Sequence, residues 1–485
     1  MCSSKYDSVL SLSECVSEKI RHGELDASLR LIHDFVERII TEPLCTAQVF
    51  GSKSLDDLCQ EIGAINWRRV RGDTSAMPLA GQSGAQYKNV VVYVVSKLQA
   101  SGGHTAALAD IIRLVPPVRS VVLVTGIGGA TDHAAIQHRF ESIPDVSFEY
   151  APRGKHIQKL DWLQRRLLAL VPVDVWLFNH HQDSVAVAAV QPDAGYQLHF
   201  YHHGDHHLCL GVHLNYADHI DPHPMGFHNC RDELNIQGNR YLPLVVRDMG
   251  DRPASLEFIS GAGLVTCTAA SFNKVEVPYF IRYVDVVPEL LRVSGGKHIH
   301  IGRLTPLALR RIRSGMRKLG LPESAFVYIP FVPSVWKALH EHRVDLYITS
   351  FPYGGARTLI EAMGAGVPVA VHSHCASRLL GTLDMAYEGA LVWRNPKELY
   401  DFVQRVDATT LRGQSRLSRK RYGDFHREVV LKNALPDHAA SLQAPPLYEG
   451  YVPDGLQQAL DISNQVSCTG VVWRFLYRAY RKWRS

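Results

Sequence analysis

The sequence predicts an α/β protein with two consecutive doubly wound units. Short apolar, β-branched runs alternate with helical segments between residues 89 and 407, which is typical of parallel sheets covered by helices. A chain of 485 residues is too long for one hydrophobic core. A polar, turn-rich stretch at 246–254 separates the α/β region into two halves. We therefore expect a helical N-terminal region at 1–85, Rossmann-like domains facing a cleft at 86–250 and 251–407, and a helical tail at 408–485.

The first 85 residues show helical periodicity and no strand pattern. Leu29, Ile32, Phe35 and Val36 recur at the spacing of one helix face. We expect these helices to serve packing or oligomerisation, not catalysis.

The first α/β half begins at the run Val-Val-Val-Tyr-Val-Val of residues 90–95. Such a run is expected for a strand buried on both faces. Further strands are expected at 120–125, 173–179, 196–202 and 217–220, and helices at 157–170 and 184–190.

The second α/β half follows the same pattern of strand and helix. Strands are expected at 264–268, 298–301, 325–329 and 389–393, with one more beginning at Asp345 and another starting at Val367. Helices are expected at 279–293, 306–319, 335–342, 396–406 and 408–435, the last of which could return to the first domain, and one more is expected to open at Gly354, Gly355 and Thr358.

The composition is that of an ordinary globular protein, with 46% hydrophobic and 20% charged residues. A formal charge of +5 on a chain of this size does not suggest nucleic-acid binding. The nine cysteines form no Cys-x-x-Cys pair and are expected to be reduced thiols of a cytoplasmic protein. We expect neither a signal peptide nor a transmembrane helix.

The end of the chain, residues 470–485, is rich in Trp, Tyr and Arg. As a helix it would be cationic and amphipathic, a pattern that fits peripheral contact with the inner face of a membrane. The alternative is an ordinary terminal helix that packs on the body of the protein.

The strongest chemical signal is the strand, turn and helix of residues 345–364. Gly354 and Gly355 leave backbone N–H groups accessible at a helix N-terminus, where a diphosphate binds. Thr358 adds a hydroxyl and Arg357 a cation. Glu361, one turn further along, could accept hydrogen bonds from a ribose. The alternative is an ordinary glycine-rich turn of a doubly wound domain.

This region resembles the catalytic region of O-linked N-acetylglucosamine transferase and its bacterial protein- and envelope-glycosylating relatives, in the GT-B superfamily. The similarity covers residues 260–405 and lies in Ser271-Phe-Asn-Lys274, the 345–355 segment, Thr358, Glu361 and residues 364–369. The resemblance implies that Lys274 contacts UDP, Gly355 and Thr358 hold the diphosphate, and Glu361 holds the ribose. Two departures are Ala356-Arg357 in place of His-Thr, and Glu361 in place of Asp.

The first half adds Gly102-Gly103-His104 at a strand-to-helix turn, and the run His202-His-Gly-Asp-His-His207. The glycine turn could face the nucleotide-sugar or be a simple tight turn. The histidine run could be a zinc site, a buried structural cluster or an acceptor-side catalytic patch. Consecutive histidines on a strand point to opposite faces and cannot all converge, so we expect no metal site.

We favour the catalytic patch, because the run lies at the carboxyl end of an expected strand, facing the cleft; its resemblance to strings in bacterial GT-B transferases adds support. His203, Asp205 and His206 are the candidate bases, Asp205 on condition that burial raises its pKa. Arg231 could be a second cation.

The sequence thus predicts a metal-independent, inverting glycosyltransferase without a cofactor. It would transfer a hexose or N-acetylhexosamine from a UDP-sugar to a protein or to a lipid-linked or cell-envelope glycan. The alternatives are a retaining transferase, a UDP-sugar epimerase, and a non-catalytic scaffold of the same fold.

Overall fold

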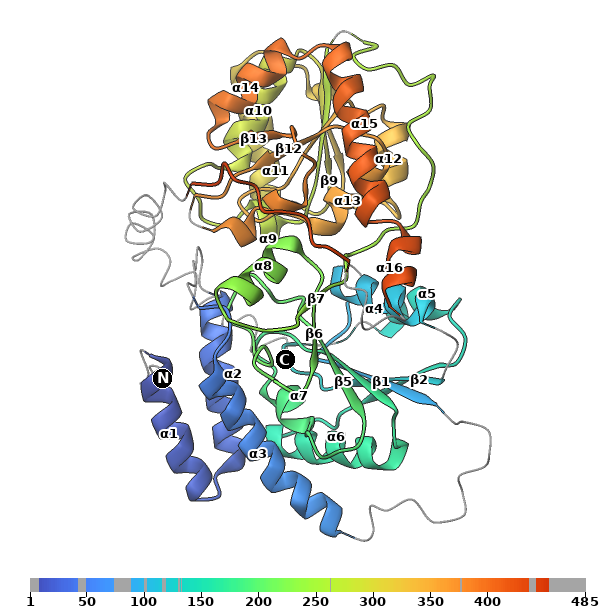
Figure 1. Ribbon diagram of the computed structural model, residues 1–485. Coiled ribbons are helices and arrows are strands. Elements are labelled where there is room, and N and C mark those ends of the chain that lie inside the picture. The colour runs from blue at the N-terminus through green and yellow to red at the C-terminus, as the bar shows by residue number, and fades with distance from the viewer. Residues whose placement is uncertain are drawn as a thin grey trace. The chain divides into compact units, whose positions relative to one another are not determined.

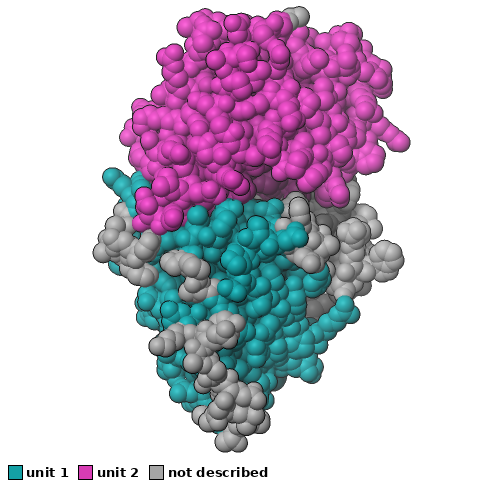
Figure 2. Space-filling model, turned by 90° about the vertical axis from the view of Figure 1, so that its right-hand side faces the viewer, with its two compact units in different colours: residues 1–242, 434–444, 485 teal, residues 243–433, 445–484 magenta. Residues whose placement is uncertain are grey.

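The computed structural model describes residues 8–41, 49–73, 89–99, 103–115, 119–129, 131, 133–261, 263–375, 377–435 and 442–452. Gly102 and the tail at 470–485 lie outside these ranges. The chain folds into two compact units, which Figure 2 shows in different colours. Among the described residues, unit 1 comprises those between 8 and 242 together with 434–435 and 442–444, and unit 2 comprises those between 243 and 433 together with 445–452. No helix in the described ranges is long and apolar enough to span a bilayer.

Unit 1 is built on a seven-stranded parallel sheet with the order β3-β2-β1-β4-β5-β6-β7 (Figure 1). Its strands are β1 Val90–Val95, β2 Arg119–Val124, β3 Val146–Tyr150, β4 Asp174–Phe178, β5 Gln197–Tyr201, β6 Asp218–Asp221 and β7 Arg240–Tyr241. All six residues of β1 are buried, as a central strand covered on both faces requires. The order reverses direction between β1 and β4, which is the switch point of a doubly wound fold.

Helices cover this sheet and connect its strands. They are α4 Gly103–Leu114, α5 His133–Phe140, α6 His156–Leu170, α7 Ser184–Ala189 and α8 Pro224–Asp232.

The N-terminal helices share the hydrophobic core of unit 1. They are α1 Val9–Arg21, α2 Leu25–Thr41 and α3 Lys53–Gly72. Helix α3 passes so close to α7 that a Cβ on Gly63 would lie 1.8 Å from the Ala188 carbonyl oxygen. Asn66 also donates a hydrogen bond to Gln164 on α6 at 2.8 Å. The region predicted as a separate helical segment is therefore part of the first unit, because its apolar faces are buried against α6 and α7.

Unit 2 contains a six-stranded parallel sheet with the order β10-β9-β8-β11-β12-β13. Its strands are β8 Val265–Ala269, β9 Lys297–Ile301, β10 Phe326–Ile329, β11 Leu346–Ile348, β12 Val369–His372 and β13 Leu391–Trp393. Its helices include α9 Phe272–Val275, α10 Tyr283–Ser294, α11 Pro306–Lys318, α12 Val335–Glu341, α13 Ala356–Gly364 and α14 Pro396–Arg405. Counted along the chain, this is the 3-2-1-4-5-6 order, with its switch point between β8 and β11.

The chain then forms α15 Ala408–Phe425 and α16 Glu428–Ala434. Helix α15 packs on α13 within unit 2, where Ser418 Oγ donates to the Val367 carbonyl at 2.9 Å and Arg419 donates to the Gly364 carbonyl at 2.6 Å. The return to unit 1 comes later than the sequence predicted, beginning at Ala434. There the Arg240 guanidinium donates to the carbonyl oxygen of Ala434 at 3.0 Å.

The sequence did not predict five of these elements, α5, β3, α8, β7 and α9. Strand β3 lies at the edge of its sheet and is only partly buried, so its residues, Val-Ser-Phe-Glu-Tyr, lack a continuous apolar run. Helix α8 begins with Pro224, in a segment whose prolines are typical of a turn. Proline nevertheless fits the first position of a helix.

Candidate functional site

The switch point of unit 2 brings together Lys274 and the glycine turn before α13, which are part of the set that the sequence predicted for nucleotide-sugar binding. Helix α9 follows β8 and carries Lys274, while the turn after β11 contains Gly354 and Gly355 and leads into α13. In open α/β sheets, ligands bind outside the carboxyl ends of the strands at such a point.

Helix α13 begins without a side-chain cap. Gly355 is its N-cap residue and makes no side-chain hydrogen bond. The first N–H groups of a helix have no intrahelical acceptor, and the helix dipole places partial positive charge there. The turn is also tightly packed, because a Cβ on Gly354 would lie 2.5 Å from Thr382 Oγ1 and 2.9 Å from the Gly381 carbonyl oxygen. Gly354 is therefore required sterically, whether or not the turn binds a diphosphate as the sequence predicted.

Lys274 places its ammonium group at the start of α13. Its Nζ donates to the Gly354 carbonyl at 2.5 Å. A Cβ on Gly355 would lie 3.7 Å from the same nitrogen. Burial lowers the pKa of Lys274 to about 8. A cation next to the positive end of a helix is a favourable arrangement for an anionic ligand.

Thr358 and Arg357, in the first turn of α13, already have protein partners. The Thr358 hydroxyl donates to the Gly355 carbonyl at 3.0 Å. The Arg357 guanidinium donates from Nη1 to the Val245 carbonyl at 3.1 Å. Both side chains are partly exposed. An anion at this helix end would have to compete with these contacts or add to them.

Glu361 connects two helices of unit 2. Its Oε2 accepts a hydrogen bond from the backbone N–H of Trp336, in the first turn of α12, at 3.0 Å. The carboxylate thus caps α12, a role that the sequence did not reveal.

The switch point of unit 1 contains His104, which lies in the first turn of α4. Its Nε2 lies 3.0 Å from the Phe178 carbonyl oxygen at the end of β4, which assigns the proton to this nitrogen. Burial lowers the pKa of His104 to about 4, so the ring is neutral. Gly103, next to it, is exposed and a side chain would meet no atom there.

Asp183 joins the strand ends at the same switch point, although no sequence pattern indicated its role. It is fully buried, caps α7 and accepts hydrogen bonds from Ser96 and Thr125, each at 2.6 Å. These contacts hold together the segments that follow β1, β2 and β4.

His203 lies against His104 and a third histidine, His180. The centroid of the His203 ring lies 4.1 Å from that of His104 and 5.3 Å from that of His180. Neither His203 nitrogen has a hydrogen-bond partner in the described part of the chain. Burial and the neighbouring histidines hold the pKa of His203 well below its ordinary value. The imidazole is therefore neutral at pH 7, the form that can accept a proton.

Asp205 is an ionised carboxylate and not the raised-pKa base that the sequence allowed for. Burial opposes its ionisation, but the charge and hydrogen bonds of His223 and His206 outweigh burial and lower the pKa of Asp205. The His223 Nδ1 atom lies 2.8 Å from Asp205 Oδ2, and His206 Nδ1 lies 3.7 Å from Oδ1. Gly226 on α8 makes room, since its Cβ would lie 2.4 Å from Asp205 Oδ2.

Arg231, expected as a second cation, has partners on its own helix. Its guanidinium donates to both carboxylate oxygens of Asp232, at 2.7 and 2.9 Å, and to His228 at 3.0 Å. These contacts account for Arg231 without a ligand.

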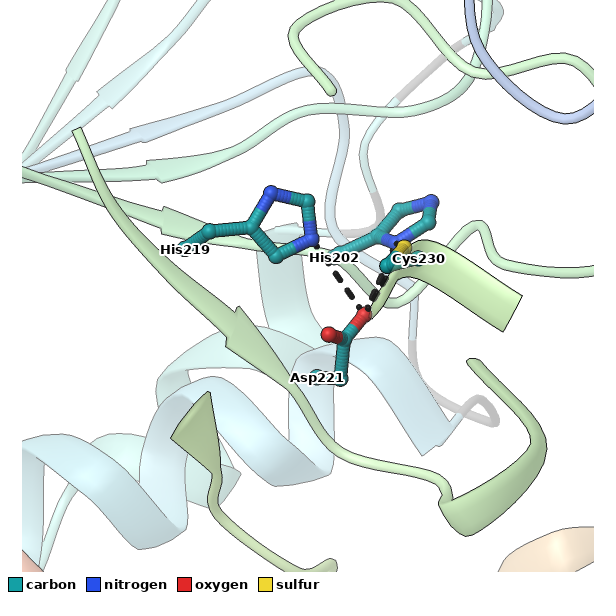
Figure 3. A group of neighbouring side chains, drawn as sticks. All are labelled: His202, His219, Asp221 and Cys230. Atoms are coloured by element: carbon teal, nitrogen blue, oxygen red, sulfur yellow. Dashed lines mark hydrogen bonds and ion pairs between the residues drawn. The ribbon is translucent and has the colours of Figure 1, made fainter. Parts of the chain in front are cut away.

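A separate group in unit 1 joins His202, His219, Asp221 and Cys230 (Figure 3). All four residues are buried. The sequence did not predict this group, because its members come from β6, α8 and the residue after β5, and no local spacing links them.

No protein-family model and no curated protein matches the sequence. Solved structures do match in fold. Alr3699/HepE of Anabaena, in complex with UDP and glucose, has a TM-score of 0.53 at 15% identity, and the match covers 72% of this chain and 98% of HepE. The lipopolysaccharide outer core galactosyltransferase WaaB has a TM-score of 0.53 at 14% identity, over 72% of this chain and 98% of WaaB. A glycosyltransferase from Rickettsia africae has a TM-score of 0.53 at 9% identity, over 72% and 97%.

Each match covers almost the whole length of the solved structure. This chain also has two parallel sheets, each with its own switch point. They confirm the fold that the sequence predicted. The protein therefore has the GT-B fold of glycosyltransferases, with two consecutive Rossmann-like domains.

Proposed function

We propose that the protein is a glycosyltransferase that takes a hexose or N-acetylhexosamine from a UDP-sugar. The observation that carries this proposal is the position of Lys274, whose ammonium group lies beside the uncapped N-terminus of α13 at the switch point of unit 2. The complex of HepE with UDP and glucose supports the choice of donor.

The proposed chemistry is the transfer of a sugar from UDP to an acceptor hydroxyl or amide. The bond between the anomeric carbon and the diphosphate breaks, the bond to the acceptor atom forms, and the acceptor loses a proton. Negative charge develops on the departing UDP. Lys274 and the first N–H groups of α13 would stabilise that charge, so the donor would need no metal ion.

The proton of the acceptor requires a base, which we assign to His203 in unit 1. The imidazole is neutral and has two nitrogens without a protein partner among the described residues. Asp205, with its low pKa and its contact to His223, is a weaker base and would position its neighbours.

Calorimetry with UDP tests the donor assignment. Wild type should bind UDP, and Lys274→Met should bind it at least tenfold more weakly. Lys318→Met, at the exposed end of α11, is the matched control and should bind like wild type. Arg357→Ala tests the predicted role of Arg357. If this variant and wild type bind UDP with equal affinity, Arg357 is not part of the site. Equal affinity of wild type and Lys274→Met would refute the proposed donor site.

Turnover separates the transferase from the other candidates. A donor screen by thermal shift identifies the UDP-sugar, because a ligand at 100 times its dissociation constant stabilises the protein by about 2.7 kcal/mol. With the UDP-sugar so identified, we expect the protein to release UDP, at least by slow hydrolysis of this donor. An epimeric UDP-sugar formed without acceptor would indicate an epimerase, and the absence of all turnover would indicate a scaffold.

The acceptor is proposed to be a protein or a lipid-linked or cell-envelope glycan. Membrane contact through residues 470–485 would favour the glycan. Flotation of the protein with anionic liposomes, with and without these residues, distinguishes the two classes, and equal flotation would remove the membrane contact.

A further inference from the structure

Four buried side chains of unit 1 converge on one point near the carboxyl edge of its sheet. His202 follows β5, His219 and Asp221 lie on β6, and Cys230 lies on α8. Figure 3 shows both imidazoles and the thiol turned toward the Asp221 carboxylate. None of the four has a part in the proposed transfer.

Four of the six distances within this group, 3.0–3.5 Å, are close to the edges of a tetrahedral metal site. His202 Nδ1 lies 3.0 Å and His219 Nε2 3.3 Å from Asp221 Oδ1. Cys230 Sγ lies 3.3 Å from His202 Nδ1 and 3.5 Å from Asp221 Oδ1. All four ligand atoms lie within 4.8 Å of one another. Zinc bonds of about 2.1 Å to nitrogen or oxygen and about 2.3 Å to sulfur place tetrahedral ligands about 3.3–3.6 Å apart.

Hydrogen bonding alone accounts poorly for this arrangement. Three groups, His202 Nδ1, His219 Nε2 and Cys230 Sγ, approach the same carboxylate oxygen, which has lone pairs for two donors. The thiol and the His202 nitrogen also lie against each other. A cation at the centre would accept electron pairs from all four atoms and remove this competition.

The charge and the surroundings also suit a divalent ion. One thiolate and one carboxylate would neutralise a 2+ charge, so a buried site would carry no net charge. The other Asp221 oxygen accepts a hydrogen bond from Asn239 at 2.8 Å, which would orient a carboxylate that binds through one oxygen. A mixed set of nitrogen, sulfur and oxygen ligands in four-coordinate geometry favours zinc.

We propose that His202, His219, Asp221 and Cys230 form a structural zinc site within unit 1. Binding releases the proton of the Cys230 thiol and forms a zinc–thiolate bond, without any redox change. The ion would join the end of β5, β6 and α8. It would thereby fix the backbone next to His203 and set the position of α8 beside Asp205, while the transfer itself would use no metal.

The test uses the full-length protein, purified without chelator and without a metal-affinity step. Mass spectrometry of bound metals should find about one zinc per chain in wild type. Cys230→Ala should lose most of it. Cys59→Ala is the matched control, because Cys59 is also fully buried in unit 1 but lies outside the group, and it should keep the zinc. Circular dichroism tests whether both variants are folded.

A second measurement decides the question even if Cys230→Ala fails to fold. Wild type stripped of metal and titrated with cobalt(II) should show a thiolate-to-cobalt charge-transfer band and the intense visible bands of four-coordinate cobalt. X-ray absorption of the zinc protein should find one sulfur at about 2.3 Å and three nitrogen or oxygen atoms at about 2.0–2.2 Å. Wild type that takes up neither metal, or folded Cys230→Ala that keeps as much zinc as Cys59→Ala, would overturn the proposal.

Discussion

The carboxylate of Glu361 on α13 holds the first turn of α12, through the 3.0 Å hydrogen bond from the backbone N–H of Trp336 to Oε2. The indole of Trp336 is fully buried and donates to the Gly250 carbonyl at 3.0 Å. Glu361 thus has a structural role that must be separated from the ribose contact predicted from the sequence.

Replacing Glu361 by Gln separates the two roles. The amide oxygen of Gln can still accept the Trp336 N–H, so the free energy of unfolding should change by less than about 1 kcal/mol. If the charged carboxylate binds the ribose, UDP should bind about tenfold more weakly. Inorganic pyrophosphate, which has no ribose, should bind both proteins equally. Calorimetry measures these affinities, and an unchanged affinity for UDP would leave Glu361 with the structural role alone.

Binding of UDP should weaken in alkaline solution because of Lys274. Burial lowers the pKa of its ammonium to about 8 in the protein without ligand, and the diphosphate requires the protonated form. Below pH 7 the group is charged. Above pH 8 each further pH unit should cost up to tenfold in affinity, until the pKa of the complex is reached. Lys274→Met should bind weakly and with a flat profile over this range, and parallel profiles for the two proteins would contradict the assignment.

His203→Ala should slow UDP release from the donor by a factor of about 10²–10⁴, the usual contribution of a general base. The affinity for UDP should not change, since the donor site is assigned to unit 2. The low pKa of His203 predicts that activity persists to pH values well below 6.5 before the base is protonated. Assays of released UDP measure the rate and its pH dependence, and calorimetry measures the affinity for UDP. The same loss in His206→Ala, with His203→Ala active, would move the base to His206.

Gly354→Ala should destabilise unit 2. The new methyl group would lie within 3 Å of the Thr382 side chain and of the Gly381 carbonyl oxygen, and the backbone atom cannot move away cheaply. Overpacking of this kind costs about 1–3 kcal/mol. Gly413→Ala on α15 is the control, because a methyl group there would meet no atom within 4 Å and helix propensity predicts a gain of about 0.5–1 kcal/mol. Chemical denaturation measures both, and equal stabilities would show that the turn can open.

The sequence predicted the fold well where the strands are central. Residues 90–95 form a buried strand with no charged position, and such runs are unambiguous. It predicted poorly at edges and short elements. Strand β3 is half exposed, and its Ser147 and Glu149 interrupt the apolar pattern. The strand order itself follows from the packing of distant segments, which no local pattern records.

The sequence indicated some residues of the candidate sites and missed others. The residues predicted for the donor follow two strands that share one sheet edge, so Lys274 and Gly354 could be paired from the order of the elements. The histidine run was predicted as one patch, with the argument that consecutive histidines cannot converge. In the structure His202 contacts Asp221 while His203 lies against His104, so these two neighbours do point apart. The partners Asp221 and Cys230 carry no signal of their own in the sequence.

The return of Ala434 to unit 1 has a consequence for synthesis on the ribosome. Arg240 is almost fully buried, and its guanidinium is shared between Asp218, at 2.8 Å, and the Ala434 carbonyl. A nascent chain that has emerged only as far as residue 433 has all seven strands of the first sheet but lacks this acceptor. The first half to leave the ribosome can therefore fold its sheet early, but the buried Arg240 gains this acceptor only after the second half has been made.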